Sequence, residues 1–111
     1  MLFSDLLKFI HTENKRLNSL YLFKTKKEEL FAKTVKMVEE TGELCNEILG
    51  INKIVRKEKW IKYTKQTLAD EIADVLITVM LIADNLNVNV EESLKNKIDK
   101  INQRYRAKND M

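Results

Sequence analysis

Residues 67–86 read TLADEIADVLITVMLIADNL, and this stretch decides the fold class of the chain. Taken at about 100° per residue, its apolar side chains cover most of a helical circumference. It therefore predicts a helix from about Thr67 to Leu86 that is buried on most of its sides. Glu71 and Asp74 share one narrow stripe of that helix. Acidic side chains are almost never fully buried unless they are paired or bind a metal, so the stripe indicates a functional site.

Three more segments show helical periodicity: residues 3–22, 27–49 and 89–106. We expect Gly50 to stop the second of them, and Asn89 with Glu92 to form a capping box at the start of the last. No segment alternates as a strand does, and the absence of Pro leaves no marked linker. The sequence thus predicts one all-α domain over residues 1–111, a four-helix bundle. We expect oligomerisation to complete the bundle, because four helices in one chain would hardly cover so apolar a third helix.

The composition sets few limits on partners. A net charge of +3 does not by itself call for nucleic acid or a membrane. No apolar stretch is long enough to cross a bilayer, and the apolar residues 1–10 are interrupted by Asp5 and Lys8, unlike a signal peptide. The single cysteine, Cys45, cannot form an internal disulfide. These features favour a cytoplasmic protein without a membrane partner.

A second pair of acids precedes the first. Glu40 and Glu43 are three residues apart in one predicted helix, as Glu71 and Asp74 are in the next. This spacing puts both acids of a pair on one helical face. Two such helices packed together would bring four carboxylates to one point, where they repel unless a cation lies between them. Oxygen ligands favour Mg²⁺ or Mn²⁺ over iron or zinc, and the only histidine, His11, is far from both pairs.

Ordinary roles for these acids are the alternative. Acids near the start of a helix are favoured by its dipole, and this applies to Glu71 and Asp74. The acids of the earlier cluster can form a solvated face that pairs with Lys36. Two matched pairs, one of them on an otherwise apolar helix, favour a metal site over these roles.

Three segments carry a family resemblance: MVEETGEL at 37–44, DEIADVL at 70–76 and VEESLKNK at 90–97. Together they resemble the motifs of the MazG-like nucleoside triphosphate pyrophosphohydrolases. These enzymes belong to an all-α superfamily that also holds dimeric dUTPases and phosphoribosyl-ATP pyrophosphohydrolases. The resemblance covers about residues 30–105, and Ala73 stands where the family more often has Gly. It implies the MazG fold, assembly as a homodimer or homotetramer, and active sites near the subunit interface.

The resemblance also implies an activity and a set of roles. The activity is cleavage of a ribo- or deoxynucleoside triphosphate to the monophosphate and pyrophosphate, with Mg²⁺ or, alternatively, Mn²⁺. Glu39 would be a further ligand, or would orient or deprotonate the attacking water. The residues that would hold Mg²⁺ are Glu40, Glu43, Glu71 and Asp74. The residues that would contact the phosphates are Lys97, Lys100 and Arg104, and a solvated basic face is the alternative for them.

The basic segment 53–65 leaves two further interpretations open. Trp60 in this segment could stack on the base of a nucleotide. The mixture of lysines and aromatic residues there is also typical of a nucleic-acid-binding module. Converging acids would repel a phosphate backbone, so nucleic acid is the less favoured partner. A third interpretation is a helical interaction protein without catalysis, which metal binding would distinguish from an enzyme.

Overall fold

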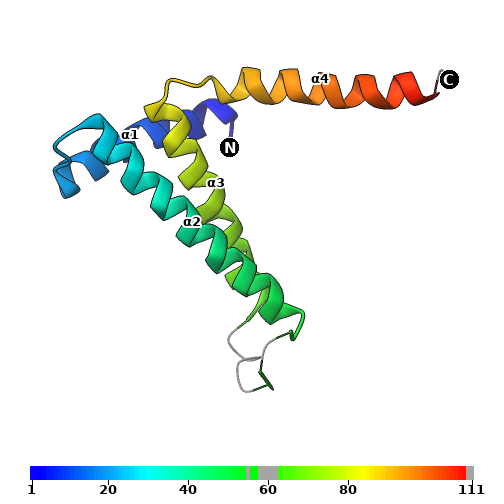
Figure 1. The fold of residues 1–111 in the computed structure, drawn as a ribbon, viewed down its shortest axis with the longest axis horizontal. Coiled ribbons are helices and arrows are strands. Elements are labelled where there is room, and N and C mark those ends of the chain that lie inside the picture. The colour runs from blue at the N-terminus through cyan, green and yellow to red at the C-terminus, as the bar shows by residue number, and fades with distance from the viewer. Residues whose placement is uncertain (55, 58–62, 110–111) are drawn as a thin grey trace.

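The computed structural model describes residues 1–54, 56–57 and 63–109. These residues form four α-helices and no strand: α1 (Phe3–Tyr21), α2 (Lys26–Ile51), α3 (Lys65–Asn85) and α4 (Val90–Asn109). Figure 1 shows their arrangement. The all-α prediction is confirmed, and each helix lies close to its predicted range. In the described part of the chain, no helix is long and apolar enough to cross a membrane.

Short polar side chains start three of the helices. The Thr25 hydroxyl accepts a hydrogen bond from the backbone N–H of Glu28 at 3.0 Å, and Thr64 does the same for Thr67 at 3.1 Å. The side-chain oxygen of Asn89 accepts the N–H of Glu92 at 3.0 Å, so the predicted cap of α4 is confirmed. Each cap satisfies a backbone donor that has no partner within the helix.

Gly50 does not stop α2, contrary to the sequence-based expectation, because the helix continues to Ile51. The reason for a glycine here is contact with another segment. A Cβ atom at Gly50 would lie 2.2 Å from the ring of Tyr63, which is closer than real Cβ contacts. The Tyr63 hydroxyl also accepts a hydrogen bond from Asn46 at 3.2 Å. Glycine therefore permits the chain entering α3 to pack on the end of α2.

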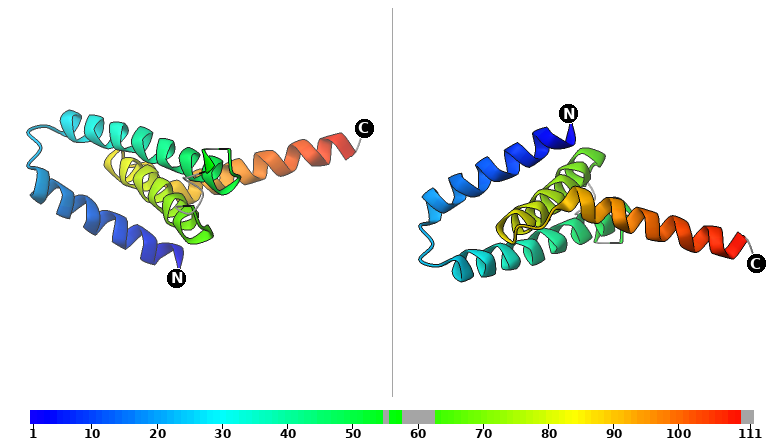
Figure 2. Two further views of the ribbon diagram at one scale, coloured as in Figure 1. Left: turned by 90° about the horizontal axis from the view of Figure 1, so that it is seen from below. Right: turned by 90° about the horizontal axis from the view of Figure 1, so that it is seen from above.

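The helix α3 lies between α1 and α2, as both views of Figure 2 show. Its contact with α1 forms a small apolar core around Ile10, Met80 and Leu81. Only the first residue of α4, Val90, packs against that core. No residue of α4 is buried, and the helix extends away from the other three (Figure 1).

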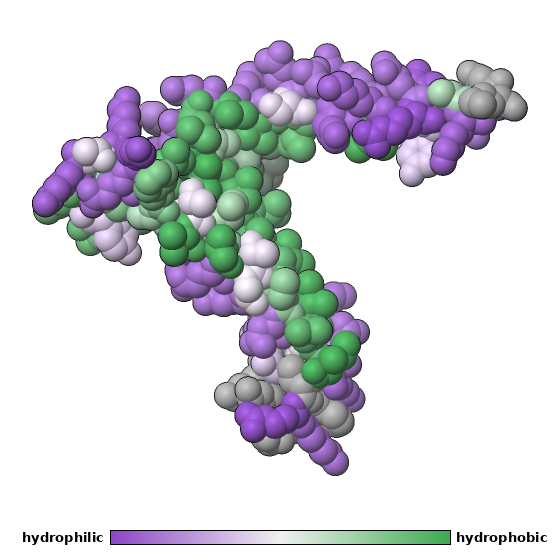
Figure 3. Space-filling model, viewed as in Figure 1, coloured by the Kyte–Doolittle hydropathy of each residue, from purple (hydrophilic) through white to green (hydrophobic). Residues whose placement is uncertain are grey.

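Apolar side chains remain exposed on the α2–α3 arm. Val35 is 68% exposed and Leu76 is 62% exposed. Figure 3 shows apolar surface over this arm in the same view. The predicted burial of α3 on most of its sides is therefore only partly met within one chain.

A buried polar network ties α1, α2 and α3 together. Lys33 donates hydrogen bonds to Asn14 at 2.6 Å, Glu29 at 2.5 Å and Asn85 at 2.8 Å. These three bonds use all three protons of the ammonium group. Asn14 in turn donates to the Leu81 carbonyl and to Asp84, at 3.1 and 2.7 Å. The network fixes the position of α2 along α3, and with it the acids further along both helices.

Candidate metal centre

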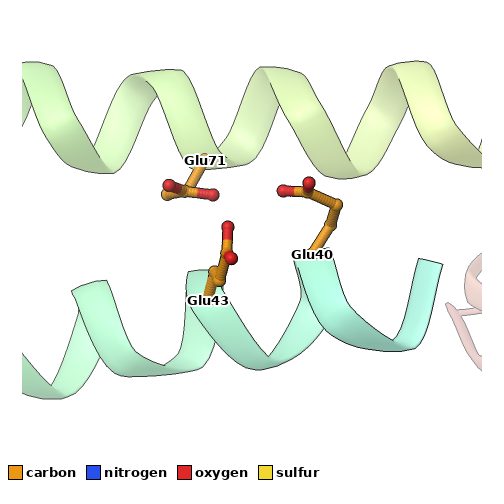
Figure 4. Close-up of side chains that lie close together, drawn as sticks. All are labelled: Glu40, Glu43 and Glu71. Carbon is orange, nitrogen blue, oxygen red and sulfur yellow. The ribbon is translucent and has the colours of Figure 1, made fainter. Parts of the chain in front are cut away.

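Three acids from two helices face one another at the centre of the α2–α3 arm. Glu40 and Glu43 lie one turn apart on α2 and point towards Glu71 of α3 (Figure 4). One carboxylate oxygen from each residue lies within 4.8 Å of the other two. Glu40 is buried, with 7% of its surface exposed, while Glu71 is half-buried and Glu43 is exposed. The structure thus brings together three of the four acids expected to hold a metal.

Two oxygens of this centre lack a partner. Glu40 Oε2 and Glu71 Oε2 are buried, and within the described residues neither has a hydrogen-bond partner. A buried polar atom without a partner costs about 1–3 kcal/mol, more when it carries charge. The two side chains point towards each other from opposite helices (Figure 4), so a cation held between their carboxylates would satisfy both atoms.

The electrostatics agree with this geometry. Burial raises the pKa of Glu71, and the negative charges of Glu43, Asp74 and Glu40 raise it further. Glu71 thus lies in an environment that opposes its own ionisation. A divalent cation would reverse that effect, because it stabilises every carboxylate around it. An all-oxygen donor set fits a hard cation such as Mg²⁺ or Mn²⁺.

Asp74 and Glu39 lie beside this group and are not part of it. Asp74 is one turn beyond Glu71 on α3, and its own side chain lines a neighbouring cavity together with Glu40. The side chain of Glu39 is 54% exposed and lies 3.4 Å from the ammonium of Lys36. The roles expected for Asp74 as a ligand and for Glu39 in catalysis stay predictions.

Lys36 lies at the edge of the acid centre. Its Nζ is 3.1 Å from Glu40 Oε1, and the unpartnered oxygen of that carboxylate is the other one, Oε2. Hydrogen bonds to Glu40 and then Glu39 raise the pKa of the lysine, which keeps it positively charged. The spacing of three and four residues between Lys36 and these acids is visible in the sequence. The sequence suggested Lys36 only as the partner of a solvated acidic face, the alternative to a metal site, whereas in the structure it also lines the cavity next to the acids.

A cavity of about 410 Å³ opens beside the acid centre. Leu17, Tyr21 and Phe23 line one side of it, and Ile77 and Leu81 of α3 line another. The rings of Tyr21 and Phe23 stack with their centroids 5.8 Å apart. The polar lining residues of the cavity are Glu13, Lys33, Lys36, Glu40, Asp74 and Thr78. The contribution of α1 was not predicted, because nothing local marks Leu17 or Tyr21 as anything but ordinary apolar residues.

The remaining predicted substrate residues are not brought to the acids. Lys97, Lys100 and Arg104 are exposed on α4, which leaves the body of the chain. Trp60 lies outside the described residues, as does much of the basic segment 53–65. The possible contacts of these residues with a substrate or with nucleic acid therefore stay predictions.

Comparison with known families agrees with the motifs and the geometry. The MazG-like family model matches residues 31–111. The chain belongs to the MazG-like family. It has no significant match among curated proteins or among solved structures. The family match contains every acid of the centre and Lys36, while α1, which supplies one wall of the cavity, precedes it.

Two buried charged residues within the part of the chain that matches the MazG-like family differ in their hydrogen bonding. Both Lys33 and Glu40 lie inside the family match, and both are buried polar residues of α2 seven positions apart. All three protons of Lys33 are used, whereas one oxygen of Glu40 has no partner among the described residues. The first arrangement stabilises a fold, and the second can bind a ligand.

Proposed function

We propose that this MazG-like protein is a Mg²⁺-dependent nucleoside triphosphate pyrophosphohydrolase that converts an NTP or dNTP to the monophosphate and pyrophosphate. One observation carries the proposal: the unpartnered, buried oxygens of Glu40 and Glu71 on facing helices. A plain interaction protein has no need for such a pair, since an apolar contact would stabilise α2 against α3 better. Family membership supports the same reaction.

The acids have distinct roles in this proposal. Glu40, Glu43, Glu71 and Asp74 hold the cation, with Mn²⁺ as the alternative to Mg²⁺. When bound, the cation supplies positive charge against the phosphate oxygens. Glu39 is the exposed carboxylate beside the centre, and it accepts the proton of the attacking water. The water oxygen bonds to phosphorus, the bridging P–O bond between the α- and β-phosphates breaks, and pyrophosphate separates from the monophosphate.

The cavity beside the acids holds the nucleoside part of the substrate. It is largely apolar where Leu17, Tyr21 and Phe23 line it, which suits the flat face of a base. Glu40 and Lys36 also line the cavity, and the sugar and phosphates would enter beside them. This placement puts the phosphates next to the acid centre and the base away from it.

We also propose that the active form is a homodimer or homotetramer. Apolar residues are exposed along both helices of the α2–α3 arm, among them Val35 and Val38 on α2 and Leu76 and Val79 on α3. Exposed apolar surface of this extent commonly marks a protein interface. A second copy would cover the part of α3 that α1 and α2 leave open.

Product analysis tests the proposed reaction. The purified protein is incubated with Mg²⁺ and a panel of ribo- and deoxynucleoside triphosphates, and the products are separated by chromatography. We expect monophosphate and pyrophosphate as products. EDTA should abolish the reaction and Glu71→Gln should slow it strongly, whereas Glu91→Gln at an exposed acid of α4 should leave it unchanged. No turnover of any nucleotide, together with no Mg²⁺-dependent rise in melting temperature, would overturn the proposal.

A further inference from the structure

One wall of the cavity beside the acid centre comes from a single face of α1. Glu13, Leu17 and Tyr21 line the cavity and are spaced four residues apart, so they lie in a row along that helix. All three precede residue 31, where the match to the MazG-like family begins. The family match therefore does not account for this wall, or for a carboxylate next to its apolar residues.

The carboxylate of Glu13 has acceptor capacity to spare. The Nε atom of Arg16, one turn further along α1, donates a hydrogen bond to Glu13 Oε1 at 3.2 Å. A carboxylate has two oxygens and about four acceptor positions, so one bond from Arg16 leaves most of them open. The side chain of Glu13 is 30% exposed and that of Arg16 is 57% exposed, so the acid is the more buried member of the pair.

The donors that line the cavity have little left to offer a base. The three protons of Lys33 are bonded within the buried network, and the hydroxyl proton of Thr78 goes to a backbone carbonyl one turn earlier at 2.7 Å. Lys36 is held at the acid centre by two carboxylates. The hydroxyl of Tyr21 can donate or accept, so it favours no type of base. Among the described lining residues, Glu13 thus sets a preference for a ligand that donates.

The position of Glu13 suits contact with the base rather than with the phosphates. Its neighbour Asn14 accepts a hydrogen bond from Lys33 at 2.6 Å, and Lys33 precedes Glu40 by seven residues. Seven residues span about 10 Å along α2. A carboxylate repels phosphate oxygens, so the part of the nucleotide beside Glu13 must be uncharged. With the phosphates at the acid centre, that part is the base.

We propose that Glu13 selects nucleotides whose base carries an exocyclic amino group. The amino N–H of cytosine, adenine or guanine donates to the Glu13 carboxylate, while the ring packs on Leu17 and the aromatic side chains beside it. Uracil and thymine have a carbonyl oxygen where cytosine has its amino group, and two acceptors that face each other repel. The inference rests on the proposed function, because it places the base of the same triphosphate in the cavity.

Pairs of substrates that differ in one group test this selection. CTP is compared with UTP, and ATP with inosine triphosphate, because in each pair a carbonyl replaces the amino group. We expect the wild-type protein to favour the amino member of both pairs by about 10- to 100-fold in kcat/KM, the range for a hydrogen bond to the edge of a base. An equal or reversed preference in either pair would overturn the inference.

The variant Glu13→Gln tests which residue makes the choice. The amide of glutamine can donate as well as accept, so the variant should admit a carbonyl edge, and its kcat/KM for CTP and UTP should become similar. Glu91→Gln makes the same change at an exposed acid of α4 and should keep the wild-type ratio. A merely structural role of Glu13 would slow both substrates alike. An unchanged ratio in Glu13→Gln would therefore contradict the proposal.

Binding of the product separates this inference from the proposed reaction. CMP and UMP are titrated in a calorimeter into the wild-type protein and into Glu13→Gln, with Mg²⁺ present. The wild-type protein should bind CMP more tightly than UMP, and the variant should lose that difference. If no nucleotide is turned over and this binding pattern is still found, the proposed reaction is wrong and the role of Glu13 stands. Turnover without discrimination refutes the role of Glu13 alone, and a protein that neither reacts nor binds refutes both.

Discussion

Two regions of the α2–α3 arm bury charge, and they differ in whether that charge is satisfied. Around Lys33 each proton of the ammonium has an acceptor, and Glu29 receives hydrogen bonds from both Lys33 and Asn85. Around Glu40 and Glu71, two buried oxygens have no partner within the described residues. The same pair of helices thus has two different polar sites. We call the fully hydrogen-bonded group around Lys33 the closed network, and the group around Glu40 and Glu71, which has unpartnered oxygens, the open centre. The difference separates residues whose charges are paired within the fold from residues that could bind a cation.

The pKa values of one buried acid in each region shift in opposite directions, that of Glu29 downwards and that of Glu71 upwards. Burial alone would raise the pKa of Glu29, but hydrogen bonds from Lys33 and Asn85 outweigh it and hold that pKa below its usual value. Burial raises the pKa of Glu71, and neighbouring carboxylates add to the rise. The ionised form of Glu29 is thus stabilised by partners in its own chain, whereas the ionised form of Glu71 is opposed by its surroundings.

The largest effect should come from breaking the closed network. Lys33→Met would leave Glu29 buried without its cation, and breaking a buried pair in this way costs about 3–5 kcal/mol. Urea unfolding followed by circular dichroism measures the loss. Lys95→Met makes the same change at an exposed position of α4 and should stay within about 0.5 kcal/mol. Equal stability of the two variants would show that the network does not hold the helices together.

Changing the open centre should affect activity and leave the fold intact. We expect Glu71→Gln to lower the rate by a factor on the order of 10²–10³, the size seen when one essential electrostatic group is removed. The metal-free protein should become more stable, because the variant removes a carboxylate that its neighbours repel. Initial rates and thermal melting in EDTA measure the two quantities. A variant that melts lower than wild type in EDTA would contradict this account of the centre.

Added metal should distinguish the two regions directly. Mg²⁺ at a hundred times its dissociation constant should stabilise the protein by about 2.7 kcal/mol, provided that it binds only the folded state. Glu71→Gln should abolish this shift. Lys33→Met should keep most of the shift although it starts from a lower stability, because its network lies outside the acid centre. Melting curves over a Mg²⁺ titration measure all three proteins.

The smallest expected effect is a pH dependence of opposite sign in the two regions. Because the folded pKa of Glu71 is raised, its contribution is present at low pH and is lost as pH rises through that pKa. The folded pKa of Glu29 is lowered, so its contribution is present above the unfolded value of about 4.3 and is lost as pH falls. In EDTA, Glu71→Gln should gain stability relative to wild type as pH rises above about 4.3. Glu29→Gln should instead lose stability relative to wild type as pH rises up to about 4.3, and the difference should then stay constant. Parallel pH profiles of melting temperature would contradict the contrast.

Local sequence spacing foretold the helices and the meeting of the two acidic motifs. The three-residue spacings place Glu40 with Glu43, and Glu71 with Asp74, whatever the rest of the chain does. Spacing did not foretell that Asp74 would lie outside the closest group, because that depends on the rotation of α3 about its axis. It did not foretell the reason for Gly50 either, since the Tyr63 ring comes from a distant segment.

The sequence by itself therefore determined four helices, the Asn89 cap of the last one, and two matched pairs of acids, because these depend on neighbours three or four residues away. Only the tertiary structure decided which carboxylate oxygens remain without a partner, and that Lys33 would be fully paired. The direction of α4 was also decided there, in the turn after Asn85, where Asn87 takes a left-handed conformation at φ 55°. The physical reason is that such contacts join residues dozens of positions apart, and one turn reorients every residue that follows it.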